Sequence, residues 1–514
     1  MKRIDNHKIL KMKIKITAAI LLSMLFTVSC TDLNEQLYDQ VEDGNFGNTP
    51  KEIDALVGGA YSSLRGFSDA ISNNFPTCEY VFFLNEVVSD EATIPTRGTN
   101  WYDGGQYQDA QKHTWKADNR MILSAWRYNY TGIAKINAII YQINKSSLTE
   151  KAKAPIFAEL KALRAYYYYN LLDLFGNVPI VTNFEDTDLP TNSTRKEVYD
   201  FVEKELTDAI PYLNGNVVYS KLTKNVAYSI LARLYLNSEA FIGVARWQDC
   251  LDACQKVTGY SLTPDFFANF ATENQTSSEI IFAIPYDSKA GTVGNYMNSM
   301  SAHYNQKLAI SPIGNYPWSA NGMCAQPGVY STFADTDKRK KCMLAGDQIN
   351  LATGSVIMMD NGEPLTYTEN LTSLTDAKEN EGVRLAKYEM KAGEQWERDH
   401  DFVLIRYAEI LMMQAECYVR LGSPDLARPF LQQVTARAGE EMPATIDLAF
   451  IDKELLKEFT FEGRRRTDNI RFGTFFLPWW EKGTTEKYRA IFPIPSTVLT
   501  TNKNLKQNPG YPLN

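Results

Sequence analysis

Apolar residues that recur every three or four positions are the feature that most constrains the fold of this 514-residue chain. Between residues 119 and 143, Trp126, Tyr130, Ile133 and Ile140 fall on one face of a 3.6-residue period. Each such stripe must be buried against another element, so the pattern predicts a packed, mainly α fold. Similar stripes predict helices over residues 49–64, 155–174, 195–213, 222–237, 246–257, 402–422, 424–438 and 446–459.

The predicted helices come in pairs joined by short turns that contain Gly or Pro, such as the turn at Gly243. This arrangement is typical of tetratricopeptide-type hairpins. The sequence lacks a strict 34-residue repeat, so an irregular helical array is the alternative that periodicity leaves open. The first helix has its own start signal, because Thr49, Pro50 and Glu52 have the spacing of a capping box.

Two long segments break the helical pattern. Residues 66–117 are rich in Gly, Asn, Asp and aromatic residues, and residues 259–401 add Ser, Pro and short β-like runs such as 280–284. Long loops inside a compact protein are often functional, and the aromatic content argues against disorder. The predicted fold class is therefore mainly α, a tetratricopeptide-like helical hairpin array with long irregular loop inserts and minor β.

The N-terminus carries an export-type leader. After a short basic segment, residues 16–28 contain no charge, which matches the roughly 7–15-residue apolar core of a signal peptide and is too short to span a bilayer. Cys30 follows, and the arrangement resembles the lipobox of bacterial lipoproteins, although Thr27 stands where Leu is usual. We predict a signal peptide over residues 1–29, with Met12 as the preferred start, and lipidation of Cys30. An uncleaved anchor or an ordinary signal peptide is the alternative.

Charge and cysteine content limit the functional classes. The leader holds six Lys or Arg and one Asp, so its removal takes the formal net charge from −8 to −13. Nucleic-acid binding needs a cationic face, and nucleic acid is therefore not a predicted partner. We expect mostly free, buried thiols, with Cys324 and Cys342 the only pair that would merit a disulfide test. The cysteines after Cys30 are Cys78, Cys250, Cys254, Cys324, Cys342 and Cys417.

Several sequence segments occur in a fixed order along the chain. They are residues 160–168 and 173–179, 231–236, 406–416, 461–473, 492–495 and 507–511. Each alone would be a weak signal, but together they resemble the SusD/RagB family of outer-membrane nutrient-binding lipoproteins. In the segment EGRRRTDNIRFG, Arg464 and Asp468 lie four residues apart, as do Thr467 and Arg471, so a helical turn would pair charges along one face. We therefore interpret this segment as structural rather than ligand-binding.

The resemblance implies a surface lipoprotein that captures oligosaccharides or polysaccharide and delivers them to a SusC-like TonB-dependent outer-membrane transporter. The lipid on Cys30 would anchor the protein to the outer membrane. RagB-like members handle peptides, so peptide capture is the nearest alternative. Residues 30–514 would form one SusD-like domain, divided into a tether (30–48), an N-terminal helical part (49–258), the irregular insert (259–401) and a C-terminal helical part with the signature tail (402–514).

A neutral glycan offers C–H faces that stack on aromatic rings and hydroxyls that bond to carboxylates, amides and guanidinium groups. Residues 85–91, NEVVSDE, fit a stretch that in SusD-like proteins precedes a glycan-capturing loop. The aromatic arrangement of the starch-binding member is not reproduced, so starch is not implied. Tyr107 and Trp115 are expected to pack the loop. The predicted glycan-binding residues are Asn85, Asp90, Arg97, Asn100, Trp101, Tyr102 and Asp103, with Tyr296 and Trp318 from a second region, 294–330.

Sequence signals of an enzyme are missing. The four histidines, His7, His113, His303 and His400, are far apart, and the chain has no HExxH, no CxxC, no phosphate-binding loop, no nucleophile elbow and no EF-hand. We predict no catalytic residue, no metal and no cofactor. A glycoside hydrolase needs only two carboxylates, so it remains the alternative of another class, and a purely structural assembly protein is the third.

Overall fold

Helices α5 (Arg120–Lys145) and α6 (Glu150–Leu174) form the longest hairpin in the described part of the chain. Asn119 caps α5 by accepting hydrogen bonds from the amides of Met121 and Ile122. Gly132 of α5 allows the two helices to approach closely, because a Cβ at this position would lie 2.4 Å from the Tyr167 ring of α6. The predicted hairpin pairing is therefore present.

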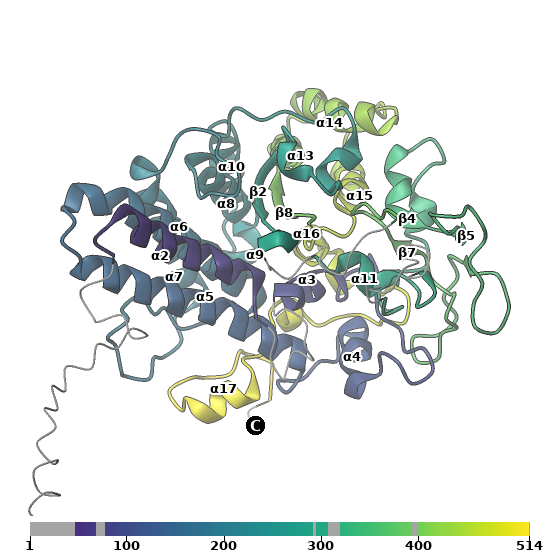
Figure 1. Ribbon diagram of the computed structural model, residues 1–514, viewed down its shortest axis with the longest axis horizontal. Coiled ribbons are helices and arrows are strands. Elements are labelled where there is room, and N and C mark those ends of the chain that lie inside the picture. Colours follow the sequence, from purple (N-terminus) through teal and green to yellow (C-terminus); the bar gives the residue numbers. More distant parts are fainter. Residues whose placement is uncertain (1–46, 68–77, 291–294, 307–318, 393–398, 513–514) are drawn as a thin grey trace, which may run out of the picture. The chain divides into compact units, whose positions relative to one another are not determined.

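The array continues through α7 (Arg195–Ala209), α8 (Lys224–Leu236) and α10 (Trp247–Cys254), each packed on the preceding one (Figure 1). Helix α13 (Tyr407–Arg420) packs against α10, and it contacts both α14 (Pro424–Ala438) and α15 (Leu448–Phe459). The C-terminal helices thus extend the N-terminal array although residues 255–406 separate them in sequence. This arrangement confirms a mainly α, tetratricopeptide-like fold.

Shorter helices surround this array. Helix α2 begins with the predicted capping box, since the Thr49 hydroxyl accepts from the amide of Glu52 and the Glu52 carboxylate accepts from the amide of Thr49. In the part of the chain that the structure describes, the shorter α-helices are α2 (Pro50–Ser62), α3 (Cys78–Glu86), α4 (Gln106–Lys112), α9 (Ser238–Ile242), α11 (Met297–Ser301), α16 (Arg465–Phe472) and α17 (Ser496–Thr501).

The strands are short and pair in twos, all antiparallel. The longest pair, β2 (Ile280–Ile284) with β8 (Phe402–Arg406), is buried beside α8 and α13. The other pairs are β1 (Ala92–Thr93) with β3 (Cys324–Ala325), β4 (Met343–Leu344) with β7 (Arg384–Leu385), and β5 (Gly346–Asp347) with β6 (Thr366–Tyr367). These pairs account for the predicted minor β content.

Three local predictions were wrong. Phe402–Arg406 is a strand rather than the start of a helix, because β2 offers it a pairing partner, and the helix begins at Tyr407. Pro155 lies inside α6 rather than at its start, since Thr149 caps the helix six residues earlier. The segment 66–117 is not wholly irregular, because it contains α3 and α4.

A buried cluster of charges fastens the insert to the C-terminal helices. Arg406 Nη1 lies 2.8 Å from Glu279 Oε1 and 2.6 Å from Glu458 Oε1, and Arg406 Nη2 lies 2.7 Å from Glu462 Oε1. Arg339, in the insert, also pairs with Glu458. The side chains of all these groups are at most 7% exposed, and a buried ion pair of this kind costs much stability only when one partner is removed.

The structure, a computed structural model, describes residues 47–67, 78–290, 295–306, 319–392 and 399–512. The described residues from Gly47 onward belong to one compact unit. The predicted signal peptide, Cys30, the tether up to residue 46 and Trp318 lie outside these ranges. None of the helices within them has the length and apolar character needed to span a bilayer.

The six described cysteines have free thiols. Cys250, Cys254 and Cys417 are buried where α10 meets α13, and Cys78 alone is partly exposed. Cys324 and Cys342 are both buried and are not joined, so the predicted preference for free thiols is confirmed and the one candidate disulfide is not formed.

Candidate ligand-binding site

The NEVVSDE stretch contacts the C-terminal signature segment. Asp90 accepts two hydrogen bonds from Arg465, with lengths of 2.6 and 2.9 Å, and Glu91 accepts from the backbone amide of Phe461. Glu86 accepts from the amide of Gly463. The carboxylate of Asp90, which we had predicted to bind glycan, is therefore already paired within the protein.

Arg97 and Trp101 are also engaged inside the protein. The Arg97 guanidinium is 2% exposed and donates to the backbone carbonyls of Asn321 and Glu381. The Trp101 side chain is 9% exposed, donates from Nε1 to the carbonyl of Ala320 at 2.6 Å, and packs on Tyr107 with a ring separation of 5.4 Å. Trp101, predicted as a ring that stacks on glycan, is thus mostly buried, and its contacts connect the turn to Ala320 and Tyr107.

The turn formed by residues 100–103, which we call the Tyr102 turn, points its other side chains to solvent. Asn100, Tyr102 and Asp103 are exposed, and the Tyr102 ring is 55% exposed. Trp101 and Asp103 have φ values of 64° and 40°, in the left-handed region that a bulky residue such as Trp rarely adopts. Residues held in such conformations often mark functional sites.

The second predicted region contributes one described residue. Tyr296 is partly buried next to α11 and lines an internal cavity. Tyr107 and Trp115 are each 1% exposed, which confirms that they pack the loop. The structure thus places Asn100, Tyr102 and Asp103 together on the surface, and it separates them from Asn85 and Tyr296, which line the cavity.

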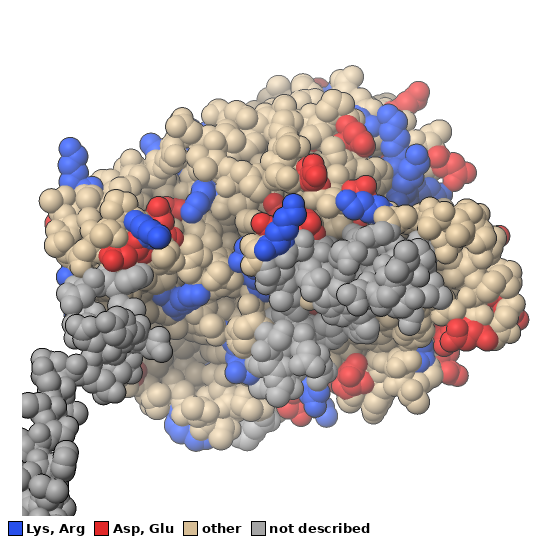
Figure 2. Space-filling model, viewed as in Figure 1, with Lys and Arg blue, Asp and Glu red and all other residues tan. Residues whose placement is uncertain are grey.

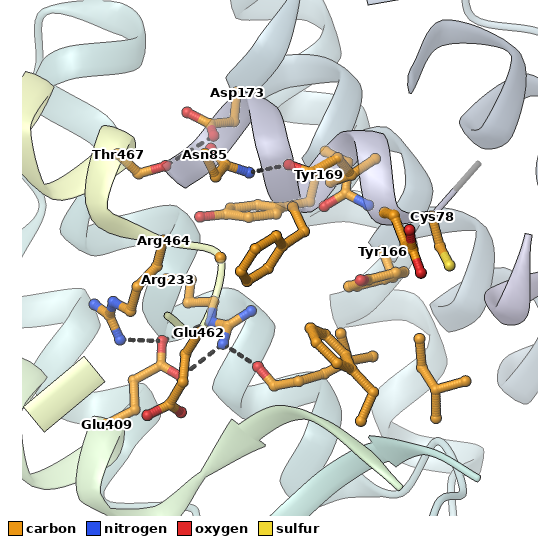
Figure 3. A pocket seen from close by; sticks show the side chains of 18 of the residues that line it. Cys78, Asn85, Tyr166, Tyr169, Asp173, Arg233, Glu409, Glu462, Arg464 and Thr467 are labelled. Atoms are coloured by element: carbon orange, nitrogen blue, oxygen red, sulfur yellow. Dashed lines mark hydrogen bonds and ion pairs between the residues drawn. The ribbon is translucent and has the colours of Figure 1, made fainter. Parts of the chain in front are cut away.

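The signature segments meet around this cavity, which has a volume of about 120 Å³ (Figure 3). Arg233 comes from α8, Glu409 from α13, Asp173 from α6, and Arg464 immediately precedes α16. Two Arg233 nitrogens lie 2.6 Å from the two Glu409 oxygens. Four segments far apart in sequence therefore contribute charged side chains to the lining of one cavity.

Arg464 pairs with Asp468 at 3.1 Å, as the four-residue spacing predicted. Asp468 also pairs with Arg471 at 2.7 Å, and Thr467 donates to Asp173 at 2.8 Å. Burial would raise the pKa of Asp468, but Arg464 and Arg471 outweigh it and lower this pKa to about 2. These contacts confirm the structural interpretation of the EGRRRTDNIRFG segment.

Several polar atoms that line the cavity have no partner. Glu79 Oε2 and Asn85 Oδ1 of α3 and Asp173 Oδ1 of α6 are buried and accept no hydrogen bond from described residues. Burial raises the pKa of Glu79 to about 8. Sequence analysis singled out Asn85 but missed Glu79. Glu79 is one of two carboxylates in α3, CEYVFFLNE, and nothing in that pattern distinguishes it from Glu86.

Charges of both signs are mixed on the outer surface. In Figure 2, Lys and Arg side chains are interspersed with Asp and Glu over the described residues of the face shown. Within the described ranges, no group of three or more His, Cys, Asp or Glu side chains is arranged to hold a metal ion. Two features of the predicted region and its surroundings have groups available to a ligand: the exposed ring and polar groups of the Tyr102 turn, and the unpaired polar atoms of the cavity.

The fold and these features define a class, a tetratricopeptide-like helical scaffold whose inserted loops carry exposed polar and aromatic residues. The profile of the family described as "Starch-binding associating with outer membrane" matches residues 80–236, and that of the family described as "SusD family" matches residues 251–511. The second match alone covers half of the chain, and the two lie in consecutive order. The chain belongs to the SusD family.

Individual relatives agree over most of their length. The starch-binding protein SusD of Bacteroides thetaiotaomicron is 24% identical over 488 residues, covering 84% of this chain and 85% of the relative. SusD-like protein P2 of Formosa agariphila is 25% identical over 540 residues, covering 97% and 100%.

Two solved structures share the fold. A laminarin-binding SusD-like protein superposes with a TM-score of 0.71 at 23% identity, covering 90% of this chain and 100% of that one. Surface glycan-binding protein A of Bacteroides thetaiotaomicron superposes with a TM-score of 0.74 at 21% identity, with the same coverage. At these identities the likeness establishes the fold alone.

Proposed function

We propose that this protein captures oligosaccharides at the bacterial cell surface and delivers them, without chemical change, to a SusC-like TonB-dependent transporter in the outer membrane. Family membership supports the general role. The observation that carries the proposal for this chain is the Tyr102 turn, where an exposed ring stands between an exposed amide, Asn100, and an exposed carboxylate, Asp103.

The chemistry of the turn suits a neutral sugar. The Tyr102 ring can stack on the C–H face of a sugar ring, while Asn100 and Asp103 can bond to its hydroxyls. Burying roughly 80 Å² of apolar surface in one stack, at about 25 cal/mol/Å², contributes about 2 kcal/mol. A few such contacts give millimolar to micromolar affinity, which suits a protein that must release its cargo.

Trp101 holds the turn in this orientation. Its indole N–H bond to Ala320 and its packing on Tyr107 fix the backbone between Asn100 and Asp103. The strained φ of Trp101 persists because these contacts over-determine it. Trp101 is thus proposed as a positioning residue, with Tyr102 as the ring that contacts sugar. Trp318 remains a second proposed contact, and Arg97 and Asp90 are proposed only as supports.

Peptide capture is the alternative that the turn alone does not exclude, because tyrosine and carboxylate groups also bind peptides. Native affinity gels cast with laminarin, with starch and with other polysaccharides separate the two. Retardation by at least one polysaccharide supports glycan capture. Retardation by none, together with binding to a peptide library, contradicts it.

A matched pair of variants locates the site. Tyr102→Ala removes the proposed ring, and Tyr212→Ala removes another tyrosine of similar exposure, 58% against 55%, in a different part of the fold. We expect Tyr102→Ala to abolish most of the retardation and Tyr212→Ala to leave it unchanged. Equal retardation of both variants would place the site elsewhere.

Anchoring and delivery need their own tests. If Cys30 carries the lipid, Cys30→Ala should move the protein from the outer-membrane fraction to a soluble fraction, and intact cells producing the native protein should be labelled by antibody. Cys30→Ala protein that stays in the outer-membrane fraction would contradict the anchor, and intact cells with the native protein that antibody does not label would contradict the surface location.

Delivery predicts that a TonB-dependent transporter co-purifies with the lipidated protein. The absence of new reducing ends after incubation with the captured glycan is the outcome expected of a non-catalytic protein.

A further inference from the structure

The cavity of Figure 3 is lined by an acid, Glu79, that has no partner among the described residues and that the proposed glycan site does not use. Glu79 lies in the first turn of α3, is 7% exposed, and its Oε2 atom accepts no hydrogen bond from described residues. Burial is the only cause that moves its pKa, so no described cation acts on it appreciably. An isolated buried carboxyl is costly unless something pairs with it, and a structural role would have supplied a partner.

The arginines on the cavity wall are already committed. Arg233 is held by Glu409, Arg471 by Glu416 and Asp468, and Arg464 by Asp468. The remaining buried donor there, Arg464 Nη1, faces Glu409 Oε1 at 3.2 Å. The cavity therefore has little donor capacity left to offer a ligand.

Unsatisfied acceptors, in contrast, line it. Besides Glu79 Oε2, the acceptors Asn85 Oδ1 and Asp173 Oδ1 are buried and unpaired among the described residues, as are the donors Asn295 Nδ2 and Arg464 Nη1, the latter facing Glu409. Because the unpaired acceptors outnumber the unpaired donors, a ligand that fits must bring more donors than acceptors. An ammonium group supplies three donors and no acceptor, while a hydroxyl brings one donor together with acceptors.

Aromatic rings, together with aliphatic side chains such as Leu404 and Met413, form the apolar part of the lining. Rings favour cations over their faces, and a cage of rings with a carboxylate is a common recognition site for organic ammonium ions. An apolar cavity of about 150 Å³ holds benzene, so about 120 Å³ suits an amine of a few heavy atoms. Figure 3 places Tyr166 beside Cys78, the residue next to Glu79 in sequence. The lining rings are those of Phe82, Tyr128, Tyr166, Tyr169, Tyr286, Tyr296 and Phe402.

We propose that this cavity binds the ammonium group of a small organic amine, with the Glu79 carboxylate as its counter-ion and Asn85 as a further acceptor. The site is distinct from the Tyr102 turn, and it does not depend on glycan capture. An amine bound here would satisfy buried groups between α3, α6 and the C-terminal signature segment, and would therefore stabilise their packing.

The affinity should depend on pH in a defined direction. The carboxyl of Glu79 is protonated below its pKa of about 8, and an ammonium ion needs the carboxylate, so binding should tighten as pH rises from about 6 to about 8 and level off above. Among the described residues, burial and then the charge of Glu79 or of neighbouring groups raise the pKa of Cys78, Tyr107 and Tyr286, so these three groups stay uncharged in this window. The charged side chains that line the same cavity are Asp173, Arg233, Glu409, Glu462, Arg464, Asp468 and Arg471.

The test compares two probes of equal size on the full chain by saturation-transfer NMR titration: ethanolamine and its uncharged analogue ethylene glycol. We expect ethanolamine to bind and ethylene glycol to bind at least about tenfold more weakly, a difference of about 1.4 kcal/mol. Equal affinity for both, or no binding of ethanolamine, would overturn the proposal and indicate a cavity that holds only water.

Variants fix the location. Glu79→Gln keeps the shape of the side chain and should weaken ethanolamine binding at least about tenfold, whereas Glu185→Gln, which removes an exposed carboxylate, should not. Unchanged binding by folded Glu79→Gln overturns the assignment. If that variant does not fold, the pH series on the unaltered protein decides, since a flat profile between pH 6 and 8 contradicts Glu79 as the counter-ion. Tyr102→Ala should retain ethanolamine binding, which separates this site from glycan capture.

Discussion

Gly322→Ala tests how the Tyr102 turn is held. The φ of Gly322 lies outside the left-handed region, so alanine is compatible with its backbone and the substitution adds only a methyl group. That methyl carbon would lie 2.4 Å from two carbons of the Trp101 indole and 3.0 Å from the carbonyl oxygen of Met300. The variant therefore pushes directly on the buried ring that anchors the turn.

The magnitude follows from these distances. Ordinary carbon contacts are about 3.5–4.0 Å, so the ring must retreat by about 1 Å. Overpacking of this kind costs about 1–3 kcal/mol. The retreat also stretches the 2.6 Å bond from Trp101 to Ala320, whose loss adds about 0.5–1.5 kcal/mol. We expect Gly322→Ala to lower the free energy of unfolding by about 2–4 kcal/mol and to weaken glycan binding because the turn moves.

Urea unfolding followed by tryptophan fluorescence, together with native affinity gels, measures both effects. Gly58→Ala is the control: a Cβ there meets nothing within 4 Å, and alanine in the middle of α2 should stabilise by about 0.5–1 kcal/mol. If the free energy of unfolding of Gly322→Ala lies within about 0.5 kcal/mol of that of the unaltered protein, the Trp101 ring does not pack closely against residue 322, and the positioning role assigned to Trp101 is wrong.

Three further outcomes follow from buried groups. Arg406→Met should lower the free energy of urea unfolding by about 3–5 kcal/mol because it leaves buried carboxylates without a partner. Lys196→Met, which breaks an exposed ion pair, should change this free energy little, and equal losses in the two variants would contradict the buried cluster. Burial would raise the pKa of Glu458, but the neighbouring arginines outweigh burial and lower this pKa to about 2. The stability that the Glu458 carboxylate contributes should therefore be present above pH 4.5 and be lost as pH falls toward 2. An unfolding midpoint that does not change with pH in this range, or that changes equally in Glu458→Gln, would contradict this contribution. Cys324 and Cys342 should both alkylate in urea without reductant, and protection of the pair until reduction would indicate a disulfide.

Helical periodicity was a reliable guide because it reports burial directly. The stripe in residues 119–143 became α5, and the Thr49 capping box started α2 as predicted. Local patterns failed where a distant partner decided the structure. The apolar run Phe402–Arg406 suits a helix or a strand, and only pairing with Ile280–Ile284 selects the strand.

The candidate site was less predictable, because residue type does not reveal burial. Trp101 and Tyr102 are adjacent aromatic residues in one polar loop, yet one anchors the turn and the other faces solvent. Arg97 and Asp90 have side chains that could bind a glycan, but both already form hydrogen bonds with residues more than 200 positions away in sequence. Glu79 escaped notice because its peculiarity, a missing counter-ion, exists only in three dimensions.

The central claim is that the exposed ring of Tyr102 binds a sugar by stacking on it. Isothermal titration calorimetry with an oligosaccharide of whichever glycan retards the protein tests it most directly. Loss of one stacking contact worth about 2 kcal/mol predicts about thirtyfold weaker binding by Tyr102→Ala, with Tyr212→Ala unchanged. An undiminished affinity in folded Tyr102→Ala would contradict the account.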